Sequence, residues 1–159
     1  MKFRDVTRSG CYAAPMTEMH DGASGEPAAG QRKVLLVEDE ELVAMAMAEE
    51  LKAAGWTVVG PAATLEEAQA LVTSDIALDA AILDIHLQGR WVHTLADELA
   101  RRGVPFVVCT GYEMVDPDGH FASAPLIAKP IAPHRLGETL DALMNRSAPA
   151  QPPLEPGAD

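Results

Sequence analysis

The stretch Val-Leu-Leu-Val-Glu-Asp at 34–39 joins a short, wholly apolar run to two adjacent carboxylates. Four consecutive apolar residues without polar alternation are typical of a strand that is buried on both faces, as in parallel sheets. Residues 41–54 then show helical periodicity, and Gly55 follows them, a residue type common just past helix ends. One face of this predicted helix carries Val43, Met47, Leu51 and Ala54. The stretch therefore predicts a buried strand that leads into an amphipathic helix, with an acidic pair at the junction.

Short apolar runs recur along the chain and predict four more strands. They lie at 57–59, 80–83, 104–109 and 126–128. We expect Gly60-Pro61 to stop the second strand, and Pro105 to confine regular pairing of the fourth strand to its later residues. Asp84 directly follows the third strand.

Helical patterns separate most of these strands. Thr64 and Glu67 form a capping box at the start of the second helix, whose inward residues are Leu65, Ala68 and Val72. Apolar stripes at 92–99 and 136–143 predict two further helices, whereas 111–124 contains glycine, proline and acids without a stripe. The alternation predicts an α/β fold: a doubly wound, five-stranded parallel sheet with helices on both faces and a fourth helix that is short or disordered.

The chain has 159 residues, with 12 basic against 24 acidic side chains and a net charge of −12. This excess disfavours direct binding to nucleic acid or anionic lipid. Two cysteines and no long apolar run favour a reducing, cytoplasmic location without membrane insertion. Glycine and proline punctuate residues 1–30, and proline recurs in 147–159, so we expect disordered tails around one domain at 31–146.

Polar side chains follow the predicted strands where each of them ends. They are Glu38 and Asp39 after the first, Asp84 after the third, Thr110 after the fourth and Lys129 after the fifth. Ligands of open α/β sheets bind outside the carboxyl ends of the strands, so these groups are expected to converge. Carboxylates that bind a hard divalent cation, a nucleophilic carboxylate and an amine are suited to phosphoryl transfer.

Each of these residues also has a structural interpretation. Asp84 alone could be a loop residue or a cap, and Glu38 and Asp39 could be acids favoured by the dipole at a helix start. Thr110 could merely end a strand, and Lys129 could be a solvated charge.

The motifs together resemble the receiver domains of bacterial two-component response regulators. The resemblance covers residues 33–146 and rests on Val-Glu-Asp-Glu at 37–40, Leu-Asp-Ile-His-Leu-Gln-Gly at 83–89, Thr110 and Lys129-Pro130. No single motif is specific, but four in the same order, each at a strand end, are. The resemblance implies a flavodoxin-like fold.

The family's site residues transfer to matching positions of this chain. The resemblance implies that Asp84 is the phosphoacceptor, that Lys129 and Thr110 bind the phosphoryl oxygens, and that the Lys129-Pro130 bond is cis. It further implies that Glu38, Asp39 and Asp84, with the backbone carbonyl of His86, hold Mg²⁺ or Mn²⁺.

The sequence departs from the family at its switch region. The fifth strand has Leu126 or Ile127 where receivers usually have an aromatic residue, whereas Val-Cys-Thr-Gly-Tyr at 108–112 keeps the second half of the Phe-Ala-Thr-Gly-Tyr-like motif of some single-domain receivers. We therefore expect Tyr112 to take part in the switch, the alternative being a surface tyrosine packed on its own loop. His86 and Tyr112 also occupy positions that influence how long the acyl phosphate survives, although His86 could be an exposed loop imidazole.

The resemblance implies a signalling protein and not an enzyme that turns over an external substrate. We expect a stand-alone regulator, a monomer or weak dimer, that is phosphorylated by a sensor histidine kinase or phosphotransfer protein and binds a downstream protein. A degenerate receiver that binds partners without phosphorylation is the alternative. A phosphohydrolase of the haloacid-dehalogenase type is disfavoured because His86 stands where that chemistry needs a second aspartate.

Overall fold

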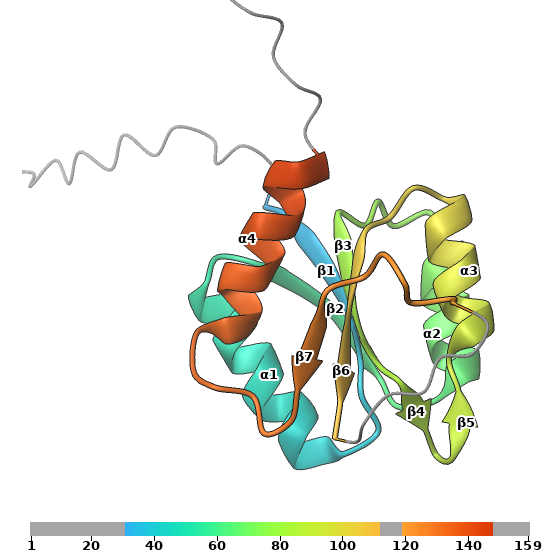
Figure 1. Cartoon of the computed structure of the whole chain (residues 1–159), viewed down its shortest axis with the longest axis horizontal. Coiled ribbons are helices and arrows are strands. Elements are labelled where there is room, and N and C mark those ends of the chain that lie inside the picture. The colour runs from blue at the N-terminus through green and yellow to red at the C-terminus, as the bar shows by residue number, and fades with distance from the viewer. Residues whose placement is uncertain (1–30, 112–118, 148–159) are drawn as a thin grey trace, which may run out of the picture.

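The computed structural model describes residues 31–111 and 119–147 (Figure 1). The main strands are β1 (Lys33–Val37), β2 (Thr57–Ala62), β3 (Ala80–Asp84), β6 (Phe106–Thr110) and β7 (Leu126–Ala128). The helices are α1 (Glu41–Ala53), α2 (Leu65–Thr73), α3 (His93–Arg101) and α4 (Arg135–Ser147), and β4 (His86–Leu87) and β5 (Arg90–Trp91) form a separate hairpin. None of these helices has the length and apolar character that crossing a bilayer would need.

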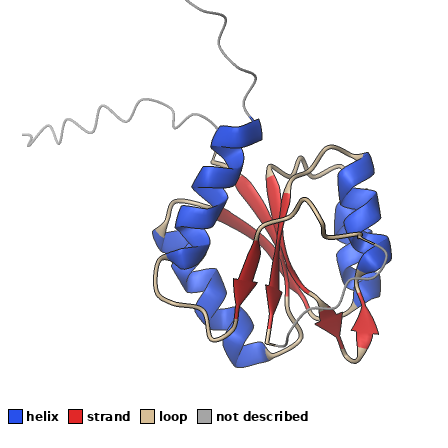
Figure 2. Cartoon of the chain, in the orientation of Figure 1, coloured by secondary structure: helices blue, strands red, loops and turns tan. Residues whose placement is uncertain are grey.

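The five main strands are all parallel and lie in the order β2-β1-β3-β6-β7. Helices α1 and α4 cover one face of the sheet, and α2 and α3 cover the other, so the three layers of Figures 1 and 2 confirm the predicted doubly wound fold. The order reverses around β1 and β3, and ligand sites of such sheets lie at the carboxyl edge of this switch point.

The sequence pattern explains why β1 and β3 are central. Residues 34–37 and 80–83 are wholly inaccessible to solvent, as expected for strands with helices on both sides. Alternate residues of each strand contribute to the two core clusters, one against α2 and α3 and one against α1 and α4. These strands therefore form a rigid base for the polar residues at their ends.

The second strand continues past the predicted stop at Gly60-Pro61. Leu35 pairs with Val59 and Val37 with Ala62, so β2 contains one extra residue, a β-bulge. Gly60 has a φ of +98° and supports this bulge. Because β2 is an edge strand, the missing N–H of Pro61 removes no necessary ladder bond. The prediction was wrong because it treated the pair as a terminator.

Other predicted boundaries differ by small amounts. Helix α1 ends at Ala53, Ala54 is its exposed C-cap, and Gly55 follows with a φ of +89°. Helix α4 includes Ser147, the first residue of the expected C-terminal tail. Thr64 caps α2 as predicted, accepting from the N–H of Glu67 at 3.1 Å.

The segment between β6 and β7 is described from residue 119, and residues 119–124 form turns without a helix. Phe121 in this segment is buried against the α2 and α3 side of the core. The predicted lack of a regular fourth helix agrees with these residues, whereas Tyr112 lies outside the described residues.

Candidate functional site

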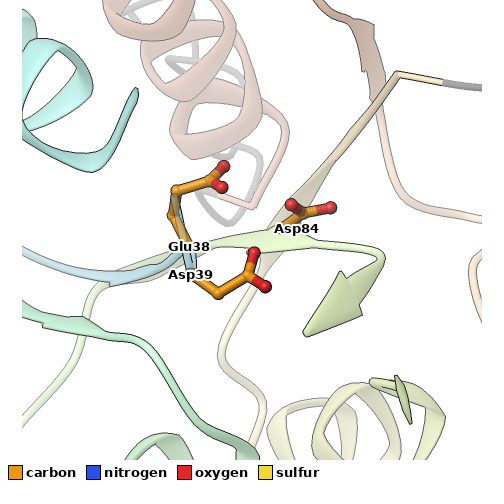
Figure 3. Close-up of side chains that lie close together, drawn as sticks. All are labelled: Glu38, Asp39 and Asp84. Atoms are coloured by element: carbon orange, nitrogen blue, oxygen red, sulfur yellow. The ribbon is translucent and has the colours of Figure 1, made fainter. Parts of the chain in front are cut away.

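Three carboxylates meet at the carboxyl edge of the sheet. Glu38 and Asp39 directly follow β1, and Asp84 is the last residue of β3, which pairs with β1 in register. One oxygen from each of them lies within 4.8 Å of the others. Figure 3 shows the three side chains close together at this edge. The predicted convergence of the first and third strand ends is therefore observed.

Lys129 supplies a positive charge to this acidic cluster. Its Nζ donates to Oε2 of Glu38 at 2.5 Å and to Oδ2 of Asp84 at 2.9 Å. Its backbone N–H donates to the carbonyl of Thr110 at 2.8 Å, which fixes the residue after β7 beside the end of β6. The Lys129-Pro130 peptide bond is cis, as the family resemblance implied.

Thr110 is buried as the last residue of β6. In the β3–β6 pairing Asp84 lies opposite Cys109, so Thr110 extends one residue further toward the same edge. Thr110 pairs with Ala128, the residue before Lys129. The structure thus brings Glu38, Asp39, Asp84, Thr110 and Lys129 to one edge of the sheet.

The charges of the site influence one another. Burial raises the pKa of Glu38, and the nearby Asp84 adds to this effect, whereas hydrogen bonds from Lys129 and from the N–H of Glu40 lower it in part. Burial lowers the pKa of Lys129, but its hydrogen bonds to Glu38 and Asp84 outweigh burial and raise it. The pKa of Glu38 is thus raised mainly by burial, and the pKa of Lys129 is raised by its two carboxylate partners. The cluster combines three carboxyl groups with one ammonium.

The hairpin β4–β5 was not predicted, and it contacts the acidic cluster through its backbone. The N–H of Gln88 donates to Oδ2 of Asp39 at 2.9 Å, and the N–H of His86 donates to Oδ1 of Asp84 at 3.3 Å. Gln88 and Gly89 have φ of +50° and +78°, the signature of a type I′ turn. Gly89, two residues after Leu87, was the available sequence signal for this turn.

The donor set suits a small, hard cation. Magnesium prefers oxygen ligands about 2.1 Å away and is held by one or two carboxylates with water and phosphate oxygens. The cluster offers three carboxylates whose oxygens lie within 4.8 Å of one another, with one ammonium as local compensation. The composition of the cluster therefore fits Mg²⁺ or Mn²⁺.

Residues 34–141 match the model of a protein family that is described as the response regulator receiver domain. A curated relative, the transcriptional regulatory protein PdtaR of Mycobacterium tuberculosis, is 32% identical over 117 residues, which cover 73% of this chain and 57% of PdtaR. The chain thus spans little more than half the length of the curated relatives it matches.

Solved structures show the same relationship. The solution structure of SdrG from Sphingomonas melonis has a TM-score of 0.62 and 37% identity over 71% of this chain and 96% of that one. The BeF₃-activated conformation of SdrG from Pseudomonas melonis has a TM-score of 0.59 and 38% identity, and the match covers 70% of this chain and 95% of SdrG. A receiver protein from Sinorhizobium medicae shares the fold, with a TM-score of 0.65 and 20% identity. The match covers 75% of this chain and 98% of that protein.

Receiver domains bind Mg²⁺ through acidic residues, and this chain has the acidic cluster. They also interact with histidine kinases or phosphotransfer proteins. Since the match covers more than half of the chain and includes both strand ends that carry the acidic cluster, the chain belongs to the response regulator receiver domain family.

Proposed function

We propose that Asp84 accepts a phosphoryl group from a phosphohistidine of a sensor histidine kinase or phosphotransfer protein. The observation that carries this proposal is the bond from Lys129 Nζ to Asp84 Oδ2 inside a cluster of three carboxylates. An ammonium and hard-cation ligands around one carboxylate are the requirements for transferring a highly charged group to it.

The chemical step is an in-line displacement at phosphorus. A carboxylate oxygen of Asp84 forms the new P–O bond while the P–N bond of the donor breaks, and the departing imidazole nitrogen keeps the electron pair. Lys129, which donates to Asp84, would move this hydrogen bond to a phosphoryl oxygen, and the hydroxyl of Thr110 at the end of β6 would supply a second donor.

Glu38, Asp39 and Asp84 would hold the cation, with the His86 carbonyl as a further ligand. When bound, Mg²⁺ offsets the repulsion between the carboxylate and the phosphoryl oxygens. His86 forms part of the hairpin beside Asp84, which supports its proposed influence on the lifetime of the acyl phosphate.

The output we propose is a change in protein binding, with no turnover of an external substrate. The phosphoryl group would draw Thr110 and Lys129 toward it and so move the segments after β6 and β7. We place this signalling in the cytoplasm and assign Tyr112 to the switch. A receiver that binds its partner without phosphorylation is the second candidate.

Phosphate incorporation tests the proposal directly. The full chain is incubated with Mg²⁺ and phosphoramidate, a small phosphodonor, and phosphorylation is followed by mass spectrometry. Asp84→Asn should abolish the added phosphate, whereas the control Asp75→Asn, at an exposed position after α2, should retain it. Equal labelling of Asp84→Asn would refute Asp84 as the acceptor, and absence of labelling in the wild type would favour the second candidate.

A further inference from the structure

A continuous series of ring contacts, called the ring stack below, leads away from the phosphoacceptor segment. The centroids of His86 and Trp91 are 4.0 Å apart with the ring planes tilted by 56°, and Trp91 lies 4.9 Å from His93 with an interplanar angle of 27°. His93 stacks on His120 at 4.5 Å and an interplanar angle of 14°, and it also contacts Phe121 at 5.1 Å. The ring stack therefore connects His86, which lies beside Asp84, with His120 and Phe121 in the segment before β7.

The hairpin geometry places Trp91 against His86. The two residues are partners in the β4–β5 pairing. The adjacent N–H of Val92 donates to the carbonyl of Ile85 at 3.3 Å, so the His86–Trp91 pair occupies the alternate, non-hydrogen-bonded position. Side chains approach each other most closely at such positions. The contact is thus determined by the register of the hairpin.

The same hairpin holds two residues of the acidic cluster. Its turn donates the N–H of Gln88 to Asp39, and its first strand donates the N–H of His86 to Asp84. A change in the twist of the hairpin would alter both hydrogen bonds. Trp91 thus contacts His86, whose N–H donates to Asp84, and it belongs to the same hairpin as Gln88, whose N–H donates to Asp39.

The far end of the stack is anchored in the fold. His120 Nδ1 lies 2.8 Å from Oδ1 of Asp97 on α3, and Phe121 is buried in the core. Within the described residues, Nε2 of His93 is buried without a hydrogen-bond partner. Ring contacts on both sides of His93 thus contribute to fixing its position, and a displacement of Trp91 would be felt at His93 and His120.

We propose that Trp91 is a positioning residue that orients the phosphoacceptor site through His86 and couples it to residues 119–121. The inference rests on the proposed function, because it concerns the carboxylates that would bind the cation and the phosphoryl group. Trp91 is 41% exposed, whereas its neighbours Leu87 and Val92 are buried in the core. Leu87 and Val92 thus anchor the hairpin in the core, and a substitution at the partly exposed Trp91 keeps this anchor while it removes the ring contacts to His86 and His93.

Trp91→Leu removes the ring and Trp91→Phe retains one, and Ile76→Ala is a control at a partly exposed apolar residue between α2 and β3. Backbone NMR of each full chain is recorded during titration with Mg²⁺ and then with beryllofluoride, a mimic of the acyl phosphate. In the wild type and in the control, shifts should occur at Asp84 and extend to His120 and Phe121.

Trp91→Leu should weaken Mg²⁺ affinity by about two- to tenfold, the loss expected for one aromatic contact. It should also remove the shifts at His120 and Phe121 while keeping those at Asp84, and Trp91→Phe should restore both. Unchanged affinity and unchanged distant shifts in Trp91→Leu would overturn the inference, as would failure of Trp91→Phe to restore either.

A second measurement does not depend on the folding of Trp91→Leu. In a Trp56→Phe variant Trp91 is the remaining tryptophan, and its emission should change on Mg²⁺ addition with the affinity measured by NMR. Constant emission at saturation would overturn the inference. If Mg²⁺ changes the Trp91 emission but beryllofluoride shifts no NMR signal, phosphorylation of Asp84 is refuted and the coupling through Trp91 stays supported. If neither Mg²⁺ nor beryllofluoride shifts the NMR signal of Asp84, the phosphorylation and the coupling are both refuted.

Discussion

Lys129 faces Glu38 and Asp84 with one ammonium, so its removal leaves two carboxylates uncompensated. The Glu38 side chain is fully buried and that of Lys129 is 20% exposed, so Lys129→Met should lower the free energy of unfolding by about 2 kcal/mol without Mg²⁺. Because the cation can replace the lost charge, saturating Mg²⁺ should recover part of this loss. Urea unfolding with and without Mg²⁺ measures both effects.

The matched control is Lys52→Met, which removes an exposed ion pair with Glu49 on α1. Exposed pairs contribute at most about 1 kcal/mol, and this variant should show the wild-type response to Mg²⁺. A loss in Lys129→Met that Mg²⁺ leaves unchanged would show that the cation and Lys129 do not compensate the same charge.

Cys109 is buried in β6, where it lies opposite Asp84 in the sheet. Burial raises the pKa of its thiol to about 12. Below that pH the unreactive thiol predominates, so in a Cys11→Ser variant a thiol reagent at pH 8 should label Cys109 at least about a thousandfold more slowly than in the unfolded chain. Labelling should accelerate as the pH rises toward 12. Native and unfolded chains labelled at equal rates would contradict this burial.

At the scale of elements, the contact between α1 and α4 depends on a missing side chain. A Cβ on Gly137 would lie 2.9 Å from the Cβ of Ala54, closer than such atoms approach. Gly137→Ala should therefore lower the free energy of unfolding by about 1–3 kcal/mol through overpacking. The higher helix propensity of alanine should offset about 1 kcal/mol of this loss. The double variant Ala54→Gly with Gly137→Ala should recover most of the loss in chemical denaturation. Additive effects of the two substitutions would exclude this contact as the cause.

Helix α3 contains an acid-sensitive group of charges near its end. Hydrogen bonds from Arg101 and then Arg102 lower the pKa of Glu98 to about 2. Because the pKa of Glu98 in the folded state lies below the ordinary value of 4.5, ionised Glu98 stabilises the fold above pH 4.5. This stabilisation is lost as the pH falls toward 2. Glu98→Gln should therefore be less stable than the wild type at pH 7, with a difference that shrinks below pH 4.5. A constant difference across a series of thermal melts would contradict this origin.

The elements differ in how far the sequence could predict them. Strands buried on both faces, such as Val34–Val37, have a strong apolar signal, and parallel strand ends must meet, which is why Glu38 and Asp84 were placed together. The hairpin strands β4 and β5 have two residues each and no apolar run, and their turn is Gln-Gly instead of the common Asn-Gly. The ring stack was missed for a related reason, since His120 comes from a segment without periodicity and only tertiary packing brings it to His93.

At the scale of the whole molecule, binding of a cation to the acidic cluster should stabilise the folded state. The carboxylates of this cluster repel one another in a chain whose net charge is already −12. A ligand that binds only the folded state stabilises it by mass action, so Mg²⁺ at about a hundredfold its Kd should add about 2.7 kcal/mol and raise the Tm by several degrees. Asp39→Asn should lose most of this response. Sodium chloride at equal ionic strength separates site binding from general screening, because screening would raise the Tm of the wild type and Asp39→Asn equally. An equal rise in both proteins with both salts would mean that the charge of the whole molecule, and not the acidic cluster, sets the response to cations.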